Sequence, residues 1–285
     1  MAFTEGSLKA YPIADVEQSV TPEQCMLYSL SVGIGTDPMD AGQLRYVVED
    51  GLCANPLMAN VLACPSFWMQ ADDTGVDWKQ TLHGEQYFEI HRPLPTTGIL
   101  LGRTRVLGIN DRGEDKGAFV YSRREVLDKA SGDLVCSVEQ TTVCRGDGGC
   151  GGNYAAPRQP RRLPERDADM VCELPISPQA ALLYRLNGDR NPLHADPAVA
   201  AQAGFPQPIL HGLCTLGVAG HAILQTVCDY DAARLKSMAV RFTAPVFPGE
   251  TLHTEMWKED DGVSFRSSVV ERDKLVLGNG WVTLA

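Results

Sequence analysis

The sequence predicts an α+β fold in which each half of the chain places helices before a run of antiparallel strands. Three observations lead to this prediction: a Gly-rich seam divides the chain, one Tyr-x-Leu segment recurs on both sides of it, and strand-like runs close each half. The recurring segment reads YSLSVGIGTDPMD at 28–40 and YRLNGDRNPLHADP at 184–197. Weak self-similarity of this kind indicates a duplicated unit. Helices followed by an antiparallel meander are an α+β order.

The seam begins with GDGGCGGN at 146–153 and continues with PRQPRRLPERD at 157–167. The first stretch has too many glycines for a helix interior or a regular strand. The second is rich in Pro and Arg and is expected to be extended. We therefore predict an N-terminal domain at 1–150, a linker at 151–170 and a C-terminal domain at 171–285. A long surface loop inside one domain is the alternative.

The elements follow from periodicity and from helix-end signals. In the N-terminal half, strands are predicted at 99–109, 118–127 and 134–144. In the C-terminal half, a short helix is predicted at 177–185 and a second at 196–204, where Asp196 caps, Pro197 opens and Gly204 stops the helix. The apolar stretch 209–230 predicts a long buried helix. Strands are then predicted at 238–246, 251–259, 262–272 and 275–285.

Composition excludes several classes of protein. The chain has 285 residues, 44% of them hydrophobic and 21% charged, which suits a globular protein with a sizeable core. Its formal net charge of −11 argues against a binder of nucleic acid or of anionic membranes. The sequence contains no apolar run long enough to predict a membrane span. No glycine-rich nucleotide loop or nucleophile-elbow motif occurs, so nucleotide redox chemistry, phosphoryl transfer and serine hydrolysis lack support.

Cysteine usage and the chain ends predict a cytoplasmic location. The nine cysteines are odd in number and none forms a C-x-x-C pair, which indicates reduced thiols and no zinc site. The start, MAFTEGSLKAYPIADVEQSV, lacks the basic and apolar regions of a signal peptide, and the end, GWVTLA, is not a peroxisomal tripeptide.

The stretch LNGDRNPLHADP at 186–197 holds the candidate chemistry. Asn191-Pro192 keeps the chain out of a helix, so Asp189 and His194 sit on a turn that can aim both side chains at one point. A carboxylate and an imidazole around one water can remove one proton and deliver another. Asn191 can hold that water or orient the imidazole. The alternatives are a surface turn, with Asp189 as a cap and His194 as a satisfied loop histidine.

A second candidate lies where His211-Gly212 opens the long apolar helix. The first N–H groups of a helix have no intrahelical partners, and the helix dipole makes that end positive. A glycine lets a ligand approach this backbone closely, as a developing oxyanion requires. A glycine needed only for tight packing is the alternative.

Three segments resemble one enzyme family. YRLNGDRNPLHADPAVAAQAGFPQPILHGLCTLG at 184–217 resembles the hydratase 2 motif of the MaoC-like (R)-specific enoyl-CoA hydratases. RFTAPVFPGETLHTEMWKE at 241–259 resembles the segment that follows it, and LHGEQYFEIHRPLP at 82–95 resembles the N-terminal half. The resemblance covers most of the chain. It extends to the two-half layout of the eukaryote-like proteins, as in the hydratase part of peroxisomal multifunctional enzyme type 2.

The resemblance implies a tandem (double) hot-dog fold, in which each half is a curved antiparallel sheet wrapped around a long central helix. It implies hydration of trans-2-enoyl-CoA to (3R)-3-hydroxyacyl-CoA in fatty-acid or related acyl-CoA metabolism. The N-terminal half would be degenerate, lacking a counterpart of His194, and would shelter the acyl chain and part of CoA. No separate cofactor and no metal are implied, because coenzyme A is part of the substrate. The implied partner is a second copy, in a homodimer.

The resemblance also assigns roles to individual residues. Asp189 and His194 would hold and activate the water, Asn191 would support them, and the Gly212 amide would bond the thioester carbonyl. The substrate would meet a second set, of which Lys116 would contact CoA and Phe242 would line the pocket. That set is His83, Gly84, Lys116, Arg190, Pro192, Leu193 and Phe242, with Arg241 as a weaker candidate. Lys116 as a solvated turn lysine and Phe242 as a core residue are the alternatives.

Two other functions stay open. A hot-dog acyl-CoA thioesterase would cleave the thioester, but it does not need the N-P-x-H pattern. A non-catalytic acyl-CoA binding subunit would need none of Asp189, Asn191, His194 and Gly212.

Overall fold

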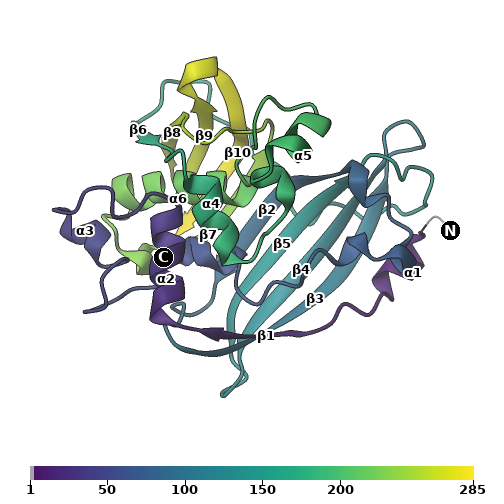
Figure 1. Cartoon of the computed structure of the whole chain (residues 1–285), viewed down its shortest axis with the longest axis horizontal. Coiled ribbons are helices and arrows are strands. Elements are labelled where there is room, and N and C mark those ends of the chain that lie inside the picture. Colours follow the sequence, from purple (N-terminus) through teal and green to yellow (C-terminus); the bar gives the residue numbers. More distant parts are fainter. Residues whose placement is uncertain (1–2) are drawn as a thin grey trace.

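Both halves of the chain join in one antiparallel sheet in the computed structural model, which describes residues 3–285 (Figure 1). The sheet has ten strands in the order β1-β3-β4-β5-β2-β7-β10-β9-β8-β6. The N-terminal half contributes β1 (Val16–Val20), β2 (Thr81–Ile90), β3 (Gly98–Asp111), β4 (Ala118–Asp128) and β5 (Leu134–Cys144). The C-terminal half contributes β6 (Met170–Pro175), β7 (Leu235–Phe242), β8 (Thr251–Glu259), β9 (Gly262–Val269) and β10 (Lys274–Leu284).

The strand order contains the same unit twice. From its outer edge the N-terminal half runs β1-β3-β4-β5-β2, and from the opposite edge the C-terminal half runs β6-β8-β9-β10-β7. The two units meet where β2 pairs with β7, from Glu85 opposite Arg241 to Glu89 opposite Ser237. The duplication suggested by the recurring Tyr-x-Leu segment is therefore visible in the topology.

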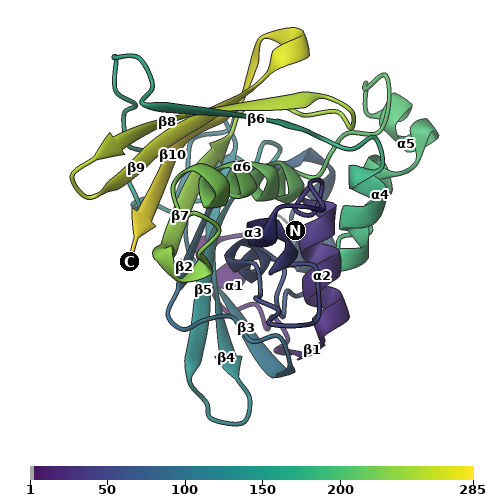
Figure 2. The same cartoon turned by 90° about the vertical axis from the view of Figure 1, so that its left-hand side faces the viewer.

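The concave side of the sheet holds α6 (Gly212–Thr226), which lies across the curved strands (Figure 2). Every residue from Cys214 to Leu224 is buried, which explains why this helix is apolar around its whole circumference. Its glycines permit close packing against the N-terminal half. A Cβ on Gly217 would lie 2.4 Å from Val32, and one on Gly220 would lie 2.4 Å from Leu57.

Within residues 3–285, only the C-terminal half contains a long central helix, so the expectation of one in each half was wrong for the N-terminal half. The corresponding stretch there forms the short 3-10 turn η1 (Pro56–Asn60), which packs against α6. Further short turns follow at Trp68–Gln70, Asp72–Thr74 and Trp78–Gln80. Prolines at 56 and 65 and the sequence DDTG at 72–75 interrupt helical hydrogen bonding here.

The other α-helices of the described residues are all shorter than α6. They are α1 (Glu5–Lys9), α2 (Pro22–Ser31), α3 (Ala41–Leu44), α4 (Ala180–Tyr184) and α5 (Pro197–Gln202). Asp196 caps α5 as predicted, by accepting a hydrogen bond from the Ala198 N–H at 2.8 Å. The predicted helix 177–185 begins only at Ala180, because Ser177 bonds the following N–H groups in a turn. The Tyr28 and Tyr184 rings, one from each recurring segment, pack 6.0 Å apart between α2 and α4.

The stretch between β5 and β6 has no helix or strand and crosses the outer, convex face of the sheet. Tyr154 packs against Tyr121, the Arg158 guanidinium lies 3.3 Å from the centre of the Tyr87 ring, and that of Arg161 lies 3.5 Å from the Trp281 ring. Arg158 and Arg161 therefore hold the segment 157–167, which we call the strap, against strands of both halves.

All nine cysteines are free thiols, as the sequence predicted. Within residues 3–285, the helices are too short or too polar to cross a bilayer.

Candidate active site

The acid and the imidazole lie on a turn between α4 and α5. Gly188 enters this turn with φ of 119°, a conformation that favours glycine. The Asp189 carboxylate accepts a hydrogen bond from the Asn191 N–H at 3.1 Å. The Asn191 side chain in turn accepts one from the Leu193 N–H at 3.1 Å and so caps the short 3-10 turn Pro192–His194. Asn191 therefore supports the pair by shaping the backbone between its two members.

The tautomer of His194 follows from its hydrogen bond. Its Nδ1 lies 2.8 Å from the Ile209 carbonyl oxygen, which can only accept, so Nδ1 carries the proton. Nε2 is then the unprotonated nitrogen and can accept a proton. The residue is 8% exposed, and burial lowers the pKa of His194 below its ordinary value. The imidazole is therefore a neutral base at neutral pH.

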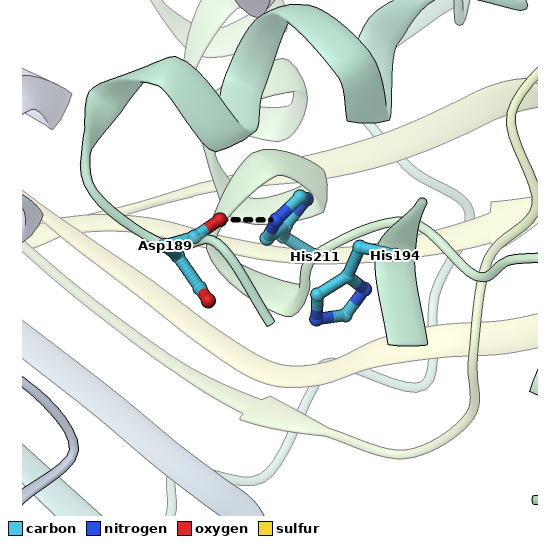
Figure 3. Close-up of side chains that lie close together, drawn as sticks. All are labelled: Asp189, His194 and His211. Carbon is cyan, nitrogen blue, oxygen red and sulfur yellow. Dashed lines mark hydrogen bonds between the residues drawn. The ribbon is translucent and has the colours of Figure 1, made fainter. Parts of the chain in front are cut away.

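His211 is a third member of the cluster, and it was not among the site residues predicted from the sequence. Its Nε2–H donates to the Asp189 main-chain carbonyl at 3.1 Å. Its ring stacks on that of His194, with the centroids 3.8 Å apart at an angle of 28° (Figure 3). Burial and then the nearby His194 lower the pKa of His211. The only sequence signal for it was its place directly before Gly212.

The spacing of the cluster suits a small bridging molecule. One carboxylate oxygen of Asp189 and one ring nitrogen from each of His194 and His211 lie within 4.8 Å of one another. No hydrogen bond joins the Asp189 carboxylate to His194 in residues 3–285, so a water between them could contact both. These three residues are also the one His/Cys/Asp/Glu group with metal-ligand spacing within residues 3–285, and each histidine donates one ring N–H to a main-chain carbonyl, which leaves its other ring nitrogen unprotonated.

The N-terminus of α6 lies beside this pair, because His211 immediately precedes Gly212. No side chain caps this end, and the Gly212 N–H has no acceptor within the described chain. A Cβ on Gly212 would lie 3.3 Å from the Phe242 ring, so the ring stands directly against this backbone. The helix therefore offers a free donor at its positive end, next to an apolar wall.

Strand β2 brings the N-terminal half to the same place. The His83 ring lies edge-on to Phe242 with the centroids 4.6 Å apart, which joins the two halves across the β2–β7 seam. His83 Nε2 lies 2.8 Å from the Gln86 amide oxygen, and burial lowers the pKa of His83 to about 4. Gly84 forms a bulge in β2, where a Cβ would lie 2.8 Å from Val143.

Other predicted residues lie around this centre or apart from it. Arg190 and Pro192 are exposed and Leu193 is half-buried on the turn itself. Lys116 is exposed in the β3–β4 turn and makes no hydrogen bond or ion pair with the cluster within residues 3–285. Pairing of Ala118 with Cys144 and of Cys144 with Thr81 nevertheless puts that turn at the same end of the sheet as His83.

The prediction from the sequence that Arg241 is a weaker candidate for the substrate cleft was wrong. Successive side chains of a strand point to opposite faces, and Phe242 faces Gly212. Arg241 instead pairs with Glu85 at 2.6 Å on the outer face, where both line a cavity of about 290 Å³ beneath the strap.

Comparison with known proteins follows the same two halves. The family model for the MFE-2 hydratase 2 N-terminal domain matches residues 19–146, and that for the MaoC-like domain matches residues 160–279. Enoyl-CoA hydratase 2, peroxisomal, of Arabidopsis thaliana is 37% identical over 99% of this chain and 96% of its own length.

Solved structures agree with the fold. A MaoC-like dehydratase from Phytophthora capsici has a TM-score of 0.87 at 31% identity, covering 99% of this chain and 98% of that one. A Mycobacterium tuberculosis protein described as a double hotdog fold has a TM-score of 0.57 at 17% identity and covers 96% of this chain and 93% of that one. The predicted double hot-dog fold is confirmed. The chain belongs to the MaoC-like, hydratase 2 family.

Proposed function

We propose that this chain is a hydro-lyase that reversibly adds water to trans-2-enoyl-CoA thioesters, giving (3R)-3-hydroxyacyl-CoA. The observation that carries the proposal is the juxtaposition of three groups: a carboxylate, a neutral imidazole with Nε2 unprotonated, and a free amide at a helix N-terminus. The family's relatives, named as hydratases and dehydratases, support this reaction class.

Each group has a part in the reaction. Asp189 and His194 hold the water between them, and one of the pair takes its proton as the oxygen attacks the β-carbon. The Gly212 N–H donates to the thioester carbonyl oxygen, where negative charge develops as the enolate forms. A proton then passes to the α-carbon. Coupled groups of this kind need not divide the two transfers between them cleanly.

The N-terminal half shelters the acyl chain and part of CoA, together with residues of the C-terminal half. His83, Gly84 and Phe242 line the acyl side of the cleft, Arg190, Pro192 and Leu193 border its mouth, and Lys116 offers charge to a CoA phosphate. The proposal includes no separate cofactor or metal. We also propose that the protein is cytoplasmic and forms a homodimer.

The assay uses crotonyl-CoA. Loss of the enoyl absorbance with formation of the (3R) product, and no release of free CoA, is the expected result. Release of free thiol without hydration would instead support the thioesterase. Binding of crotonyl-CoA without turnover would support the non-catalytic subunit.

The pH dependence follows from the lowered pKa of His194. His194 can accept a proton from the water only in its neutral form, and that form dominates above the folded-state pKa of His194, which burial places below 6.5. We expect kcat/KM to stay level from pH 8 down past the ordinary titration range of His, near pH 6.5, and to fall at lower pH. An acid limb centred above pH 6.5 would contradict this reading.

Lys116→Ala is expected to raise KM more than it lowers kcat. A phosphate contact binds the ground and transition states alike, so its loss weakens substrate binding without slowing the chemical step. Lys236→Ala is the control, since Lys236 is an exposed lysine at the opposite end of β7 from Phe242. Steady-state kinetics with crotonyl-CoA measure both, and an unchanged KM in the Lys116 variant would reject the phosphate contact.

A further inference from the structure

We propose that His211 is a positioning residue that holds the Asp189 turn and the His194 ring in register with the Gly212 amide. The inference rests on the proposed function, because it assigns His211 a part in the same reaction. His211 itself does not transfer a proton.

The turn that carries Asp189 has few hydrogen bonds to the rest of the protein. Asp189, Arg190 and Asn191 are all exposed, and glycine precedes them. Most hydrogen bonds of residues 188–191 are local, such as those between Asp189 and Asn191 and between Gly188 and Arg185. Within residues 3–285, the one bond that ties this turn to a distant element is the 3.1 Å bond from His211 Nε2–H to the Asp189 carbonyl. Losing it would free the carboxylate to move.

The side chain of His211 makes no other hydrogen bond within the described chain. The carbonyl of Asp189 can only accept, so Nε2 carries the proton and Nδ1 does not. Nδ1 is buried and has no hydrogen-bond partner in the described chain. A second proton there would be a buried donor without an acceptor, which is costly. His211 therefore stays neutral, as an anchor requires and a proton shuttle does not.

His211 bonds the main chain of Asp189, contacts the ring of His194 and directly precedes Gly212. The His211 ring stacks at 3.8 Å on His194, and its backbone is the N-cap of α6. The next residue, Gly212, carries the free N–H. A shift of His211 would move the acid, the base and the amide relative to one another. Misplacement of a reacting group by about 1 Å can cost on the order of 10² in rate.

Two variants separate the hydrogen bond from the ring. His211→Phe keeps an aromatic ring beside His194 and removes the donor, so kcat for crotonyl-CoA is expected to fall on the order of 10² with KM little changed. His211→Gln places an amide N–H near the position of Nε2 and is expected to recover much of that loss. His253→Gln, on β8 and paired with Glu173, is the matched control and is expected to keep the wild-type kcat.

A double-mutant cycle tests whether His211 acts through Asp189. In the Asp189→Asn background the His211→Phe change is expected to cost little more, because the group it positions is already lost. Additive losses, a wild-type kcat in His211→Phe, or a Gln variant as slow as the Phe variant would each overturn the proposal. A protein that lacks hydratase activity from the outset would instead remove the proposed function.

Nitrogen–hydrogen NMR correlations of the wild-type histidine rings test the geometry without any substitution, in case a variant fails to fold. The expected tautomers are Nε2–H for His211 and Nδ1–H for His194. An Nδ1–H tautomer at His211 would overturn the proposal whatever the activity.

Discussion

His194→Ala is expected to lower kcat for crotonyl-CoA hydration by on the order of 10³ and to leave the fold intact. General acid–base groups contribute about 10²–10⁴ to a rate, and we propose that His194 is one of the two such groups; its Nε2 is free to accept a proton. The remaining activity would come from the Gly212 amide and from binding. Decay of the enoyl absorbance at saturating crotonyl-CoA measures the effect, and near-ultraviolet circular dichroism checks the fold.

The matched control for this variant is another histidine outside the cluster of Asp189, His194 and His211. His91, near the far end of β2, bonds Ser137 at 3.0 Å and contacts none of the cluster. Its Ala variant should hydrate crotonyl-CoA at the wild-type rate. If His194→Ala retained near-normal turnover, His194 would have no part in the chemistry.

Asp189→Asn is expected to lower kcat by a comparable factor, on the order of 10³. The amide keeps nearly the same shape and can still accept a hydrogen bond from the Asn191 N–H, so the turn should persist. What is lost is the negative charge that takes or delivers a proton. Turnover of crotonyl-CoA and thermal unfolding of the same preparation separate lost chemistry from lost stability.

Asp196→Asn serves as the control for this change. Asp196 lies on the same segment, but its side chain caps α5 by accepting from the Ala198 N–H. Asparagine caps helices about as well as aspartate does, so neither stability nor kcat should change appreciably. A similar loss of rate in both variants would attribute the effect to the turn and not to the Asp189 carboxylate.

Local signals predicted several strands of both halves. The strands predicted at 251–259 and 134–144 match β8 and β5 residue for residue, because turns bound them clearly. The edge strands β1 and β6 were missed, since they are short and depend on pairing with β3 and β8. The long helix at 209–230 is confirmed but shorter, because the chain leaves α6 after Thr226 and turns through positive φ at Asp229 and Tyr230.

The candidate site divides in the same way. Asp189, Asn191 and His194 could be found because they lie close together on one turn, where Pro192 restricts the backbone and Gly188 permits a positive φ. His211 and His83 reach the same point from α6 and from β2 in the other half, and no local pattern encodes that meeting. The prediction that Arg241 lines the cleft was wrong for a related reason. The face of the sheet on which Arg241 lies depends on the register of β7 with β2.

The most direct test of the account is a crystal structure of the wild-type protein soaked with (3R)-3-hydroxybutyryl-CoA, the product of crotonyl-CoA hydration. The 3-hydroxyl oxygen should replace the reacting water, within hydrogen-bond distance of both the Asp189 carboxylate and His194 Nε2. The thioester oxygen should lie about 2.7–3.1 Å from the Gly212 nitrogen. A product bound with its hydroxyl away from that pair, or with its carbonyl away from α6, would contradict the mechanism.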